Sequence, residues 1–389
     1  MRIGLLYPSD DPIGPTEWSG TPAGLASGFA ALGVEVVPIG AGLPPGFHHA
    51  VALLARIRTR NMAINERLPI RRAARGIVLR RTIERALPLD GIVAMSTELY
   101  DLAAVIPEGV PCVTYDDATL AQMWEHPDSD LRQYGYERRF VERWIHWERQ
   151  SAGAADVNCV STQWAAASFS RHYGVPAESV RVVGMGHRSR SQLGGNLRDW
   201  SSPRYLFVGI DWERKNGDAV IAAFRLVRER QPTATLHLVG RIPPIHEPGV
   251  VSHGLLKRDD FAAQQLLDEL FASSTCFVLP SKFDPSPIAY LEAGSAGLPV
   301  VATSEGGAGE LLGEGALTVP PGDINAIAAA MLRLTDPVDG PRRGSAASTA
   351  AADATWQQVA SRILDAFPSQ PGMHRAVRAD RDLAGEPGV

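Results

Sequence analysis

Short apolar runs alternate along the chain with longer stretches in which apolar residues recur at helical spacing. In the first half the short runs are "RIGLLYP", "VEVVPI", "GIVAMST", "PCVTYDD" and "DVNCVST". In the second half they are "RYLFVGI", "ATLHLVG", "TCFVLPS", "LPVVATS" and "ALTVP". Strands that alternate with helices form parallel sheets with helices on both faces, so the pattern predicts an α/β fold.

The alternation stops once, at residues 186–204. This stretch, "GHRSRSQLGGNLRDWSSPR", is rich in Gly, Ser and Arg, which is typical of an interdomain linker. We therefore expect two Rossmann-like domains, over residues 1–190 and 200–352. Residues 343–354, "RGSAASTAAADA", favour a small-residue connection, an amphipathic helix follows at about 355–367, and 368–389 reads as a poorly ordered tail. Two such domains facing each other across a cleft are suited to nucleotides and sugars.

Composition narrows the possible functions only slightly. The chain has 389 residues, of which 45% are hydrophobic and 21% charged, which is enough for two full cores. A net charge of -5 gives no general attraction to nucleic acid. The amino terminus lacks the pattern of a signal peptide and no apolar run is long enough to span a membrane, so we expect a cytoplasmic protein. The cysteines, which lack metal-site spacing, are expected to be buried thiols: Cys112, Cys159 and Cys276.

Two carboxylates in the segment "FVLPSKFDPSPIAYLEAGSAGLPVVAT" are candidates for ligand binding. Asp284 and Glu292 stand eight positions apart and follow a buried-looking strand, where open α/β sheets bind ligands. A solvated helix face is the alternative, since most carboxylates are exposed. A second pair, Asp128 and Asp130, resembles a metal-binding pair, but its polar, proline-containing surroundings favour a surface turn.

Several motifs agree in order and spacing with one known family. "RYLFVGIDWERKNGDAVIAAFRLVRERQPTATLHLVG", "FVLPSKFDPSPIAYLEAGSAGLPVVATSEGGAGELL" and "ALTVPPGD" resemble glycosyltransferase family 4, and "ADVNCVSTQWAAASFSRHYGVPAESVRVVGMG" does so more loosely. The resemblance implies a GT-B fold and retention of anomeric configuration. It also implies catalysis without a metal or cofactor, a nucleoside-diphosphate sugar as donor, and a final helix that returns to the first domain.

The resemblance assigns roles to the charged residues of the second domain. Glu292 would accept hydrogen bonds from the ribose hydroxyls, for which a carboxylate is well suited, and Asp284 would lie beside the donor sugar. Asp284 replaces the family's usual Glu, so its reach differs. Arg214 and Lys215 in "DWERKNG" would stabilise the negative charge of the leaving nucleotide. The family often has Gly-Arg where this chain has Gly209 followed by Ile, and Arg214 would replace the missing charge.

Backbone groups are expected to complete the donor site. Proline replaces the family's usual glycine at position 287, which leaves the N–H groups of Ser286 and Ile288 at the helix start as donors. In the turn "SEGGAGE", Gly306 and Gly307 would permit unusual backbone angles near the donor. An ordinary turn is an equal alternative there.

The first domain offers two further positions. Gly20 precedes a helix start and matches the family's glycine-rich turn, which touches donor and acceptor. Asp116 follows a strand near the place where many relatives carry a sugar-contacting His, and a helix-capping role is equally open.

Residues 56–85 carry ten arginines against two glutamates and have helical periodicity. This pattern is compatible with contact to an anionic membrane surface or a phosphorylated acceptor, and with a solvated face whose arginine stems cover apolar surface.

These observations favour a retaining glycosyltransferase that uses a nucleotide-sugar donor and a small-molecule, glycan or lipid-linked acceptor. Two alternatives remain, a nucleotide-sugar epimerase of the same fold and a non-catalytic sugar-binding protein.

Overall fold

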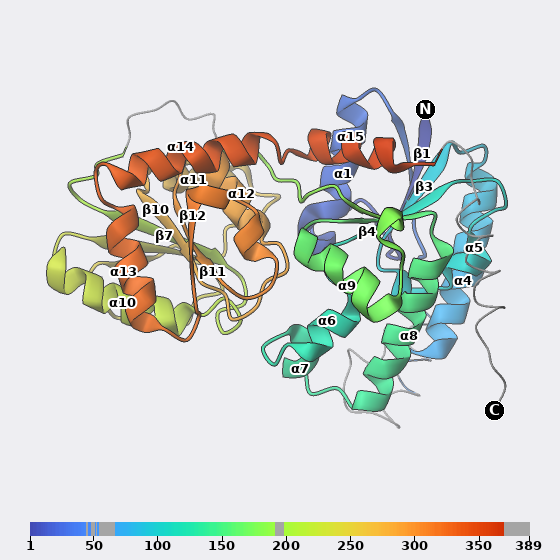
Figure 1. Ribbon diagram of the computed structural model, residues 1–389, viewed down its shortest axis with the longest axis horizontal. Helices are drawn as coiled ribbons and strands as arrows, with labels where there is room; N and C mark the ends of the chain where they lie inside the picture. Colours follow the sequence, from blue (N-terminus) through green and yellow to red (C-terminus); the bar gives the residue numbers. More distant parts are fainter. Residues whose placement is uncertain (44–45, 48–50, 52, 54–66, 191–197, 369–389) are drawn as a thin grey trace. The chain divides into compact units, whose positions relative to one another are not determined.

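A computed structural model describes residues 1–43, 46–47, 51, 53, 67–190 and 198–368 (Figure 1). The chain divides into two compact units. Unit 1 combines residues 1–184 with the chain from Val359 onward, and unit 2 comprises Met185–Gln358. The division therefore falls just before the stretch that the sequence identifies as a linker.

Unit 1 contains a six-stranded parallel sheet in the order β2-β1-β3-β4-β5-β6. The inner strands are buried on both faces, as expected for strands that read as continuous apolar runs. Proline 38 is tolerated in β2 because this strand lies at the sheet edge. The strands are β1 (Arg2–Leu6), β2 (Glu35–Ile39), β3 (Gly91–Ala94), β4 (Cys112–Asp116), β5 (Val157–Val160) and β6 (Val180–Val182).

Helices of unit 1 begin and end at residues with recognisable capping properties. Pro22 occupies the first turn of α1, and the Thr162 side chain accepts from the Ala165 N–H at the start of α9. Gly174 closes α9 in the left-handed conformation. The α-helices are α1 (Thr21–Ala31), α4 (Pro69–Ala86), α5 (Leu102–Val105), α6 (Leu120–Glu125), α7 (Asp130–Gln133), α8 (Arg138–Ala154) and α9 (Gln163–Tyr173), with 3-10 turns at Glu17–Gly20, Thr97–Leu99 and Ala177–Ser179.

Unit 2 has a second six-stranded parallel sheet, in the order β12-β11-β10-β7-β8-β9. The chain runs from β7 outward through β8 and β9, then returns to β10 on the other side of β7. The direction of strand order therefore reverses between β7 and β10, which is where open α/β sheets bind ligands. The strands are β7 (Arg204–Gly209), β8 (Thr235–Gly240), β9 (Val250–Ser252), β10 (Cys276–Leu279), β11 (Val300–Thr303) and β12 (Ala316–Val319).

Helices cover both faces of this sheet, with α10 and α13 packed together on one face and α12 and α14 on the other (Figure 1). Asp260 and Asp323 cap the starts of α11 and α13 by accepting from backbone N–H groups three residues on. The helices are α10 (Gly217–Arg230), α11 (Phe261–Ser273), α12 (Ile288–Ser295), α13 (Ile324–Leu334) and α14 (Asp339–Ala352), with 3-10 turns at Ala308–Glu310 and Gly313–Gly315. Two Rossmann-like halves are thus confirmed.

The expected small-residue connection at 343–354 is wrong, because most of it belongs to α14. Its small residues serve close packing. A Cβ added at Gly344 would lie 2.3 Å from the carbonyl oxygen of Gly297, and one added at Gly294 would lie 2.8 Å from that of Ala347. The helix therefore lies against backbone, where a larger side chain would not fit.

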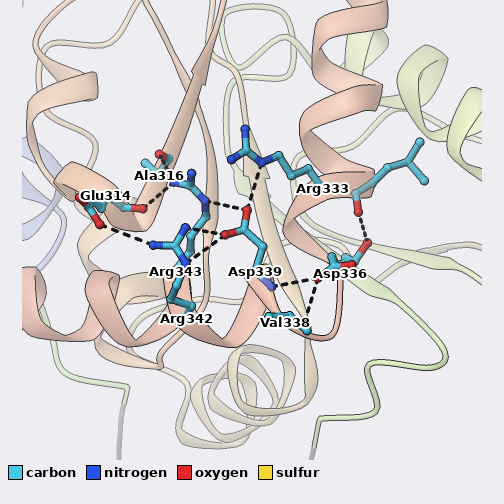
Figure 2. A network of polar contacts seen from close by, with 10 residues as sticks. Glu314, Ala316, Arg333, Asp336, Val338, Asp339, Arg342 and Arg343 are labelled. Carbon is cyan, nitrogen blue, oxygen red and sulfur yellow. Dashed lines mark hydrogen bonds and ion pairs between the residues drawn. The ribbon is translucent and has the colours of Figure 1, made fainter.

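A cluster of charges closes the turn between α13 and α14 (Figure 2). Asp339 accepts hydrogen bonds from Arg333 at 3.0 Å, Arg343 at 3.1 Å and Arg342 at 2.5 Å. Asp336 accepts from the Asp339 N–H at 2.9 Å. These bonds fix the chain reversal, and the hydrogen bonds from Arg342, Arg343 and Arg333 lower the pKa of Asp339 to about 2.

The segment expected to be a linker is attached to unit 2 wherever it is described. The His187 Nε2 lies 2.9 Å from the Ala351 carbonyl oxygen. Arg198 donates to the Ser274 carbonyl at 2.8 Å and to that of Gly297 at 3.2 Å.

A last helix, α15 (Trp356–Ala366), carries the chain from unit 2 into unit 1. Within unit 1, Arg362 donates to the Val183 carbonyl at 3.2 Å. A Cβ added at Gly91 of β3 would lie 2.5 Å from the Phe367 ring. The end of the described chain thus packs onto unit 1.

The three cysteines are buried free thiols, as expected. In the described part of the chain, no helix is both long enough and apolar enough to cross a membrane.

The arginine-rich segment is described only from residue 67, so the arginines at 56, 58 and 60 lie outside the described residues. In α4, Arg71 and Arg75 are buried, whereas Ile70 and Ile77 are exposed. Arg72 lies over the Trp147 ring at 5.0 Å. Several of these arginines therefore cover internal surface, which is the second interpretation offered by the sequence.

Candidate functional site

Two loops meet at the carboxyl ends of β7 and β10, where the strand order of unit 2 reverses. The first loop joins β7 to α10 and the second joins β10 to α12. The Lys282 N–H donates to the Arg214 carbonyl at 2.9 Å, and Asn216 donates to the Pro280 carbonyl at 3.0 Å. Asn216 adopts the left-handed conformation as it caps α10. One backbone bond and one bond from the Asn216 side-chain amide thus join the two loops.

The three residues expected to be catalytic lie together in these loops. Lys215 Nζ donates a hydrogen bond to Asp284 Oδ2, and the nearest Arg214 nitrogen lies 3.8 Å from the same oxygen. The Ser281 hydroxyl donates to it at 3.3 Å. The side chain of Asp284 is only 8% exposed, and that of Lys215 13%. Two cations thus lie around one buried carboxylate at this edge of the sheet, and Arg214 also lies 3.8 Å from Asp211.

Two glycines allow this close arrangement. A Cβ added at Gly209 would lie 3.0 Å from the Lys215 side chain, so the missing side chain leaves room for the lysine stem. Gly306 has a φ of 83°, and its added Cβ would lie 2.2 Å from the Asp284 carbonyl oxygen. The expected unusual angle is confirmed at Gly306. At Gly307, with a φ of -85°, that expectation is wrong.

Helix α12 begins beyond Pro287, so Asp284 precedes the helix and only Glu292 lies on it. Ser286, two residues before the helix, is buried, and Ile288, the first residue of the helix, is half-buried. Tyr290 fixes the helix to the sheet, because its hydroxyl donates to the Leu279 carbonyl at 2.6 Å. Burial, followed by the charge of Asp284, raises the pKa of Tyr290 well above its usual range.

Glu292 is held by a residue that the sequence did not single out. Arg190 Nη2 donates to Glu292 Oε1 at 3.2 Å, and both residues are buried. No sequence signal pointed to Arg190, because a Gly-, Ser- and Arg-rich stretch reads as a linker.

Gly20 and Asp116 lie in unit 1. Gly20 caps α1 in the left-handed conformation, and Trp18 and Ser19 before it also have positive φ values of 35° and 57°. Such backbone strain is typical of functional loops. The Trp18 ring lies 5.8 Å from that of Tyr115, which neighbours Asp116 on β4.

Asp116 belongs to a buried group of acids in unit 1. Burial, then the charges of Glu148, Glu98 and Asp117, raise the pKa of Asp116 well above its usual range. Glu148 accepts from the Leu120 N–H at 2.7 Å, and burial raises the pKa of Glu148 to about 8.

The possible metal pair does not extend into a site. Asp130 is the first residue of α7, and the Asp128 N–H lies 3.1 Å from the His126 ring nitrogen. Among the residues that the structure describes, no three His, Cys, Asp or Glu side chains gather in a way suited to a metal ion.

Comparisons with known proteins agree for both units. Residues 23–187 match the family described as Glycosyltransferase Family 4, and residues 202–336 match Glycosyl transferases group 1. Glycogen synthase of Mycobacterium tuberculosis is 32% identical over 174 residues, which cover 42% of this chain. The match spans 41% of that relative's length.

Solved structures extend the likeness in fold to nearly the whole chain. Sucrose-phosphate synthase from Thermosynechococcus elongatus has a TM-score of 0.63 at 16% identity, covering 97% of this chain and 99% of that one. The S. aureus protein TarM, solved as a mutant with Fondaparinux, alpha-GlcNAc-glycerol and UDP, has a TM-score of 0.55 at 14% identity. That match covers 76% of this chain and 59% of TarM.

Proposed function

Because the chain belongs to the glycosyltransferases, with a family 4 domain followed by a group 1 domain and the two Rossmann-like halves of the GT-B fold, we propose that it transfers a sugar from a nucleoside diphosphate to an acceptor hydroxyl. We further propose that the anomeric configuration is retained. TarM was solved with UDP, which supports a nucleotide sugar as the donor here.

The pair of cations at the strand-order reversal of unit 2 is the observation that carries this proposal. When the bond between sugar C1 and the phosphate oxygen breaks, negative charge accumulates on the departing diphosphate. Arg214 and Lys215 are already fixed at this position by the two joined loops, so they stabilise that charge with little reorganisation. Asp284 holds the lysine in place and lies beside the donor sugar.

The remaining parts of the proposed site are backbone groups and one carboxylate. The N–H groups of Ser286 and Ile288, at the start of α12, face the donor phosphates or sugar, and Glu292 accepts from the ribose hydroxyls. Gly306 brings the adjoining turn against the Asp284 backbone. In unit 1, Gly20 and Asp116 contribute the acceptor side.

The reaction is proposed to need neither metal nor cofactor, because fixed arginine and lysine side chains supply the positive charge. We expect full donor turnover in excess EDTA. Activity that is abolished by EDTA and restored by Mg²⁺ would contradict this and redirect attention to Asp128 and Asp130.

Incubation with a panel of UDP-, GDP- and ADP-sugars, with and without a cell-extract acceptor, tests the proposed reaction. A transferase releases the nucleoside diphosphate together with a glycoside. An isomeric nucleotide sugar would instead show an epimerase, and neither product would show a binding protein.

Location is part of the proposal. We propose a cytoplasmic enzyme with peripheral contact to anionic membrane through α4, where exposed Ile70 and Ile77 accompany exposed Arg80 and Arg81. Sedimentation with vesicles that contain 30% anionic lipid tests it. Pelleting that is equal with neutral vesicles would exclude the electrostatic contact.

A further inference from the structure

Arg190 is a buried arginine at the centre of four side chains of unit 2. Its own side chain is only 4% exposed. Nη1 donates to Asp268 at 2.5 Å and to Gln264 at 3.3 Å, while Nη2 donates to Glu292 at 3.2 Å. The guanidinium also lies over the Phe271 ring, 5.4 Å from its centroid. A single planar cation thus connects α11 with α12.

The backbone of Arg190 is fixed to the same turn of α12. Its N–H donates to the Ser295 hydroxyl at 2.9 Å, and that hydroxyl donates to the Glu292 carbonyl at 2.8 Å. Main chain and side chain of Arg190 therefore both reach Glu292. The side-chain bond restricts the rotamer of Glu292, and the backbone bond through Ser295 holds the turn of α12 that carries it.

Arg190 forms ion pairs of unequal length with Asp268 and Glu292. The shorter contact is with Asp268, so this aspartate largely neutralises the arginine. Of the two carboxylate oxygens of Glu292, Arg190 donates a hydrogen bond only to Oε1. Among the described residues, Oε2 has no hydrogen-bond partner. The carboxylate is held in one orientation and keeps an acceptor available for a ligand.

We propose that Arg190 is the positioning residue for nucleotide recognition, which aims Glu292 Oε2 at the ribose hydroxyls while Asp268 balances its charge. This inference rests on the proposed function, since it takes Glu292 to be the ribose acceptor. Arg190 itself does not contact the reacting atoms. It acts through Glu292, and its loss is expected to weaken nucleotide binding and to leave the chemical step unchanged.

A double-mutant cycle tests the coupling. Affinities for UDP, GDP and ADP are measured by calorimetry for the wild type, Arg190→Ala, Glu292→Gln and the double variant. We expect Arg190→Ala to weaken binding of the preferred nucleotide about tenfold in the wild type, and less than about twofold once Glu292 is changed. Equal losses in both backgrounds would show that Arg190 only stabilises the unit, and would overturn the proposal.

Arg188→Ala is the matched control. Arg188 also donates to Gln264, at 3.0 Å, and lies 3.7 Å from Asp268, but it has no contact with Glu292. Its loss is expected to leave nucleotide affinity unchanged. A tenfold loss in this variant would also overturn the proposal, because the effect would then come from α11.

Arg190→Gln covers the case in which the alanine variant does not fold, since glutamine keeps a hydrogen-bond donor and part of the stem. With the donor found active, KM is expected to rise with kcat unchanged. An unchanged KM would contradict the positioning role. If Glu292→Gln leaves affinity for all three nucleotides unchanged, the proposed donor site fails together with this inference. If only the Arg190 variants bind normally, this inference alone fails.

Discussion

The contact between Lys215 and Asp284 fixes the position of the cation that unit 2 presents to a ligand. Asp284 is buried, and its charge is compensated by Lys215, with Arg214 nearby. A buried carboxylate would be costly without these partners. The same contact fixes the lysine stem above Gly209, so the position of the cation is set before any ligand arrives.

Lys215→Met is expected to lower turnover about 100-fold, because the leaving nucleotide loses a fixed cation in the transition state. Arg214→Ala is expected to have a smaller effect. Single-turnover rates at saturating donor provide the measurement. Lys282→Met is the control, since Lys282 is nearby but more exposed and pairs with Glu213. Full activity in both the Lys215 and the Arg214 variants would mean that the diphosphate binds elsewhere.

Glu148 is expected to make unit 1 sensitive to pH. Burial raises the pKa of Glu148 from 4.5 to about 8, so the folded protein binds this proton more tightly than the unfolded chain does. The resulting stabilisation is complete below pH 4.5 and is lost as the pH rises toward 8. Between pH 5 and 8, Glu148→Gln should remove a few kcal/mol of this decline in unfolding free energy, at about 1.4 kcal/mol per pH unit.

Chemical denaturation at several pH values measures this slope. Glu142→Gln on the same helix is the control, because its side chain is 54% exposed. The raised pKa of Asp116 also makes the unfolding free energy fall as the pH rises. The slope of unfolding free energy against pH is therefore reduced but not abolished in Glu148→Gln. A slope equal to that of the wild type would contradict the prediction.

At the scale of single residues, the sequence identified site residues that belong to short motifs. The family resemblance assigned Arg214, Lys215 and Asp284 to one site, and they lie together because each follows the carboxyl end of a strand. Arg190 was not predicted. Its partners lie 74 or more positions away, so nothing in its local sequence indicates burial.

At the scale of elements, strand patterning predicted five of the six strands in each sheet, whereas the three-residue edge strands β6 and β9 and helix α14 were missed. Its run of Gly, Ala and Ser has weak apolar character, and glycine lowers helix propensity. Tertiary packing determines the outcome, since small residues allow α14 to approach backbone on α12 and at Gly315. Local sequence cannot contain that information, because the surfaces concerned are formed by other parts of the chain.

Gly344→Ala tests this close packing. In an exposed helix, alanine would be more stable than glycine by about 1 kcal/mol. Here the added methyl would lie 2.3 Å from the Gly297 carbonyl oxygen, and overpacking of this kind costs about 1–3 kcal/mol. We therefore expect net destabilisation in thermal unfolding. Ser345→Ala, on the exposed side of the same helix, should be neutral or slightly stabilising. Stabilisation by Gly344→Ala would show that α14 packs less closely.

Asp339→Asn tests the charge cluster at the α13–α14 turn. Because its arginine partners lower the pKa of Asp339 from 3.8 to about 2, its stabilisation is present above pH 3.8 and is lost as the pH falls through 2. The variant should unfold more easily than the wild type at pH 6, and the difference should shrink as the pH approaches 2. A difference that is constant with pH would show that the charge plays no part. Unfolding monitored by tryptophan fluorescence gives both curves.

At the scale of the whole molecule, the chain leaves unit 1 at Gly184 and returns to it at Val359. Sequence patterning gave the number of domains and the final helix. The placement of that helix in the first domain came from the family resemblance, since an amphipathic pattern does not specify its partner. In α15, Val359, Ala360 and Ile363 are fully buried.

Ile363→Ala is expected to destabilise unit 1 by about 2–5 kcal/mol, because it removes a buried side chain and leaves a cavity. Hydrogen exchange resolved by peptide measures the two units separately. Protection should fall in β1, β3 and β4 and remain unchanged in β7, β8 and β10. Gln357→Ala, at an exposed position of α15, is the control. Equal loss of protection in both units would mean that they unfold as one.

The return of the chain to unit 1 has a consequence for biosynthesis. A ribosome completes all six strands of the first sheet early, but the helix that packs against them emerges only after the whole of unit 2 has been made. Unit 2 is continuous in sequence, so its folding can finish as soon as its last helix leaves the exit tunnel. We therefore expect the half that is translated first to complete its packing last, and until then the surface of unit 1 that α15 covers stays accessible to chaperones and proteases.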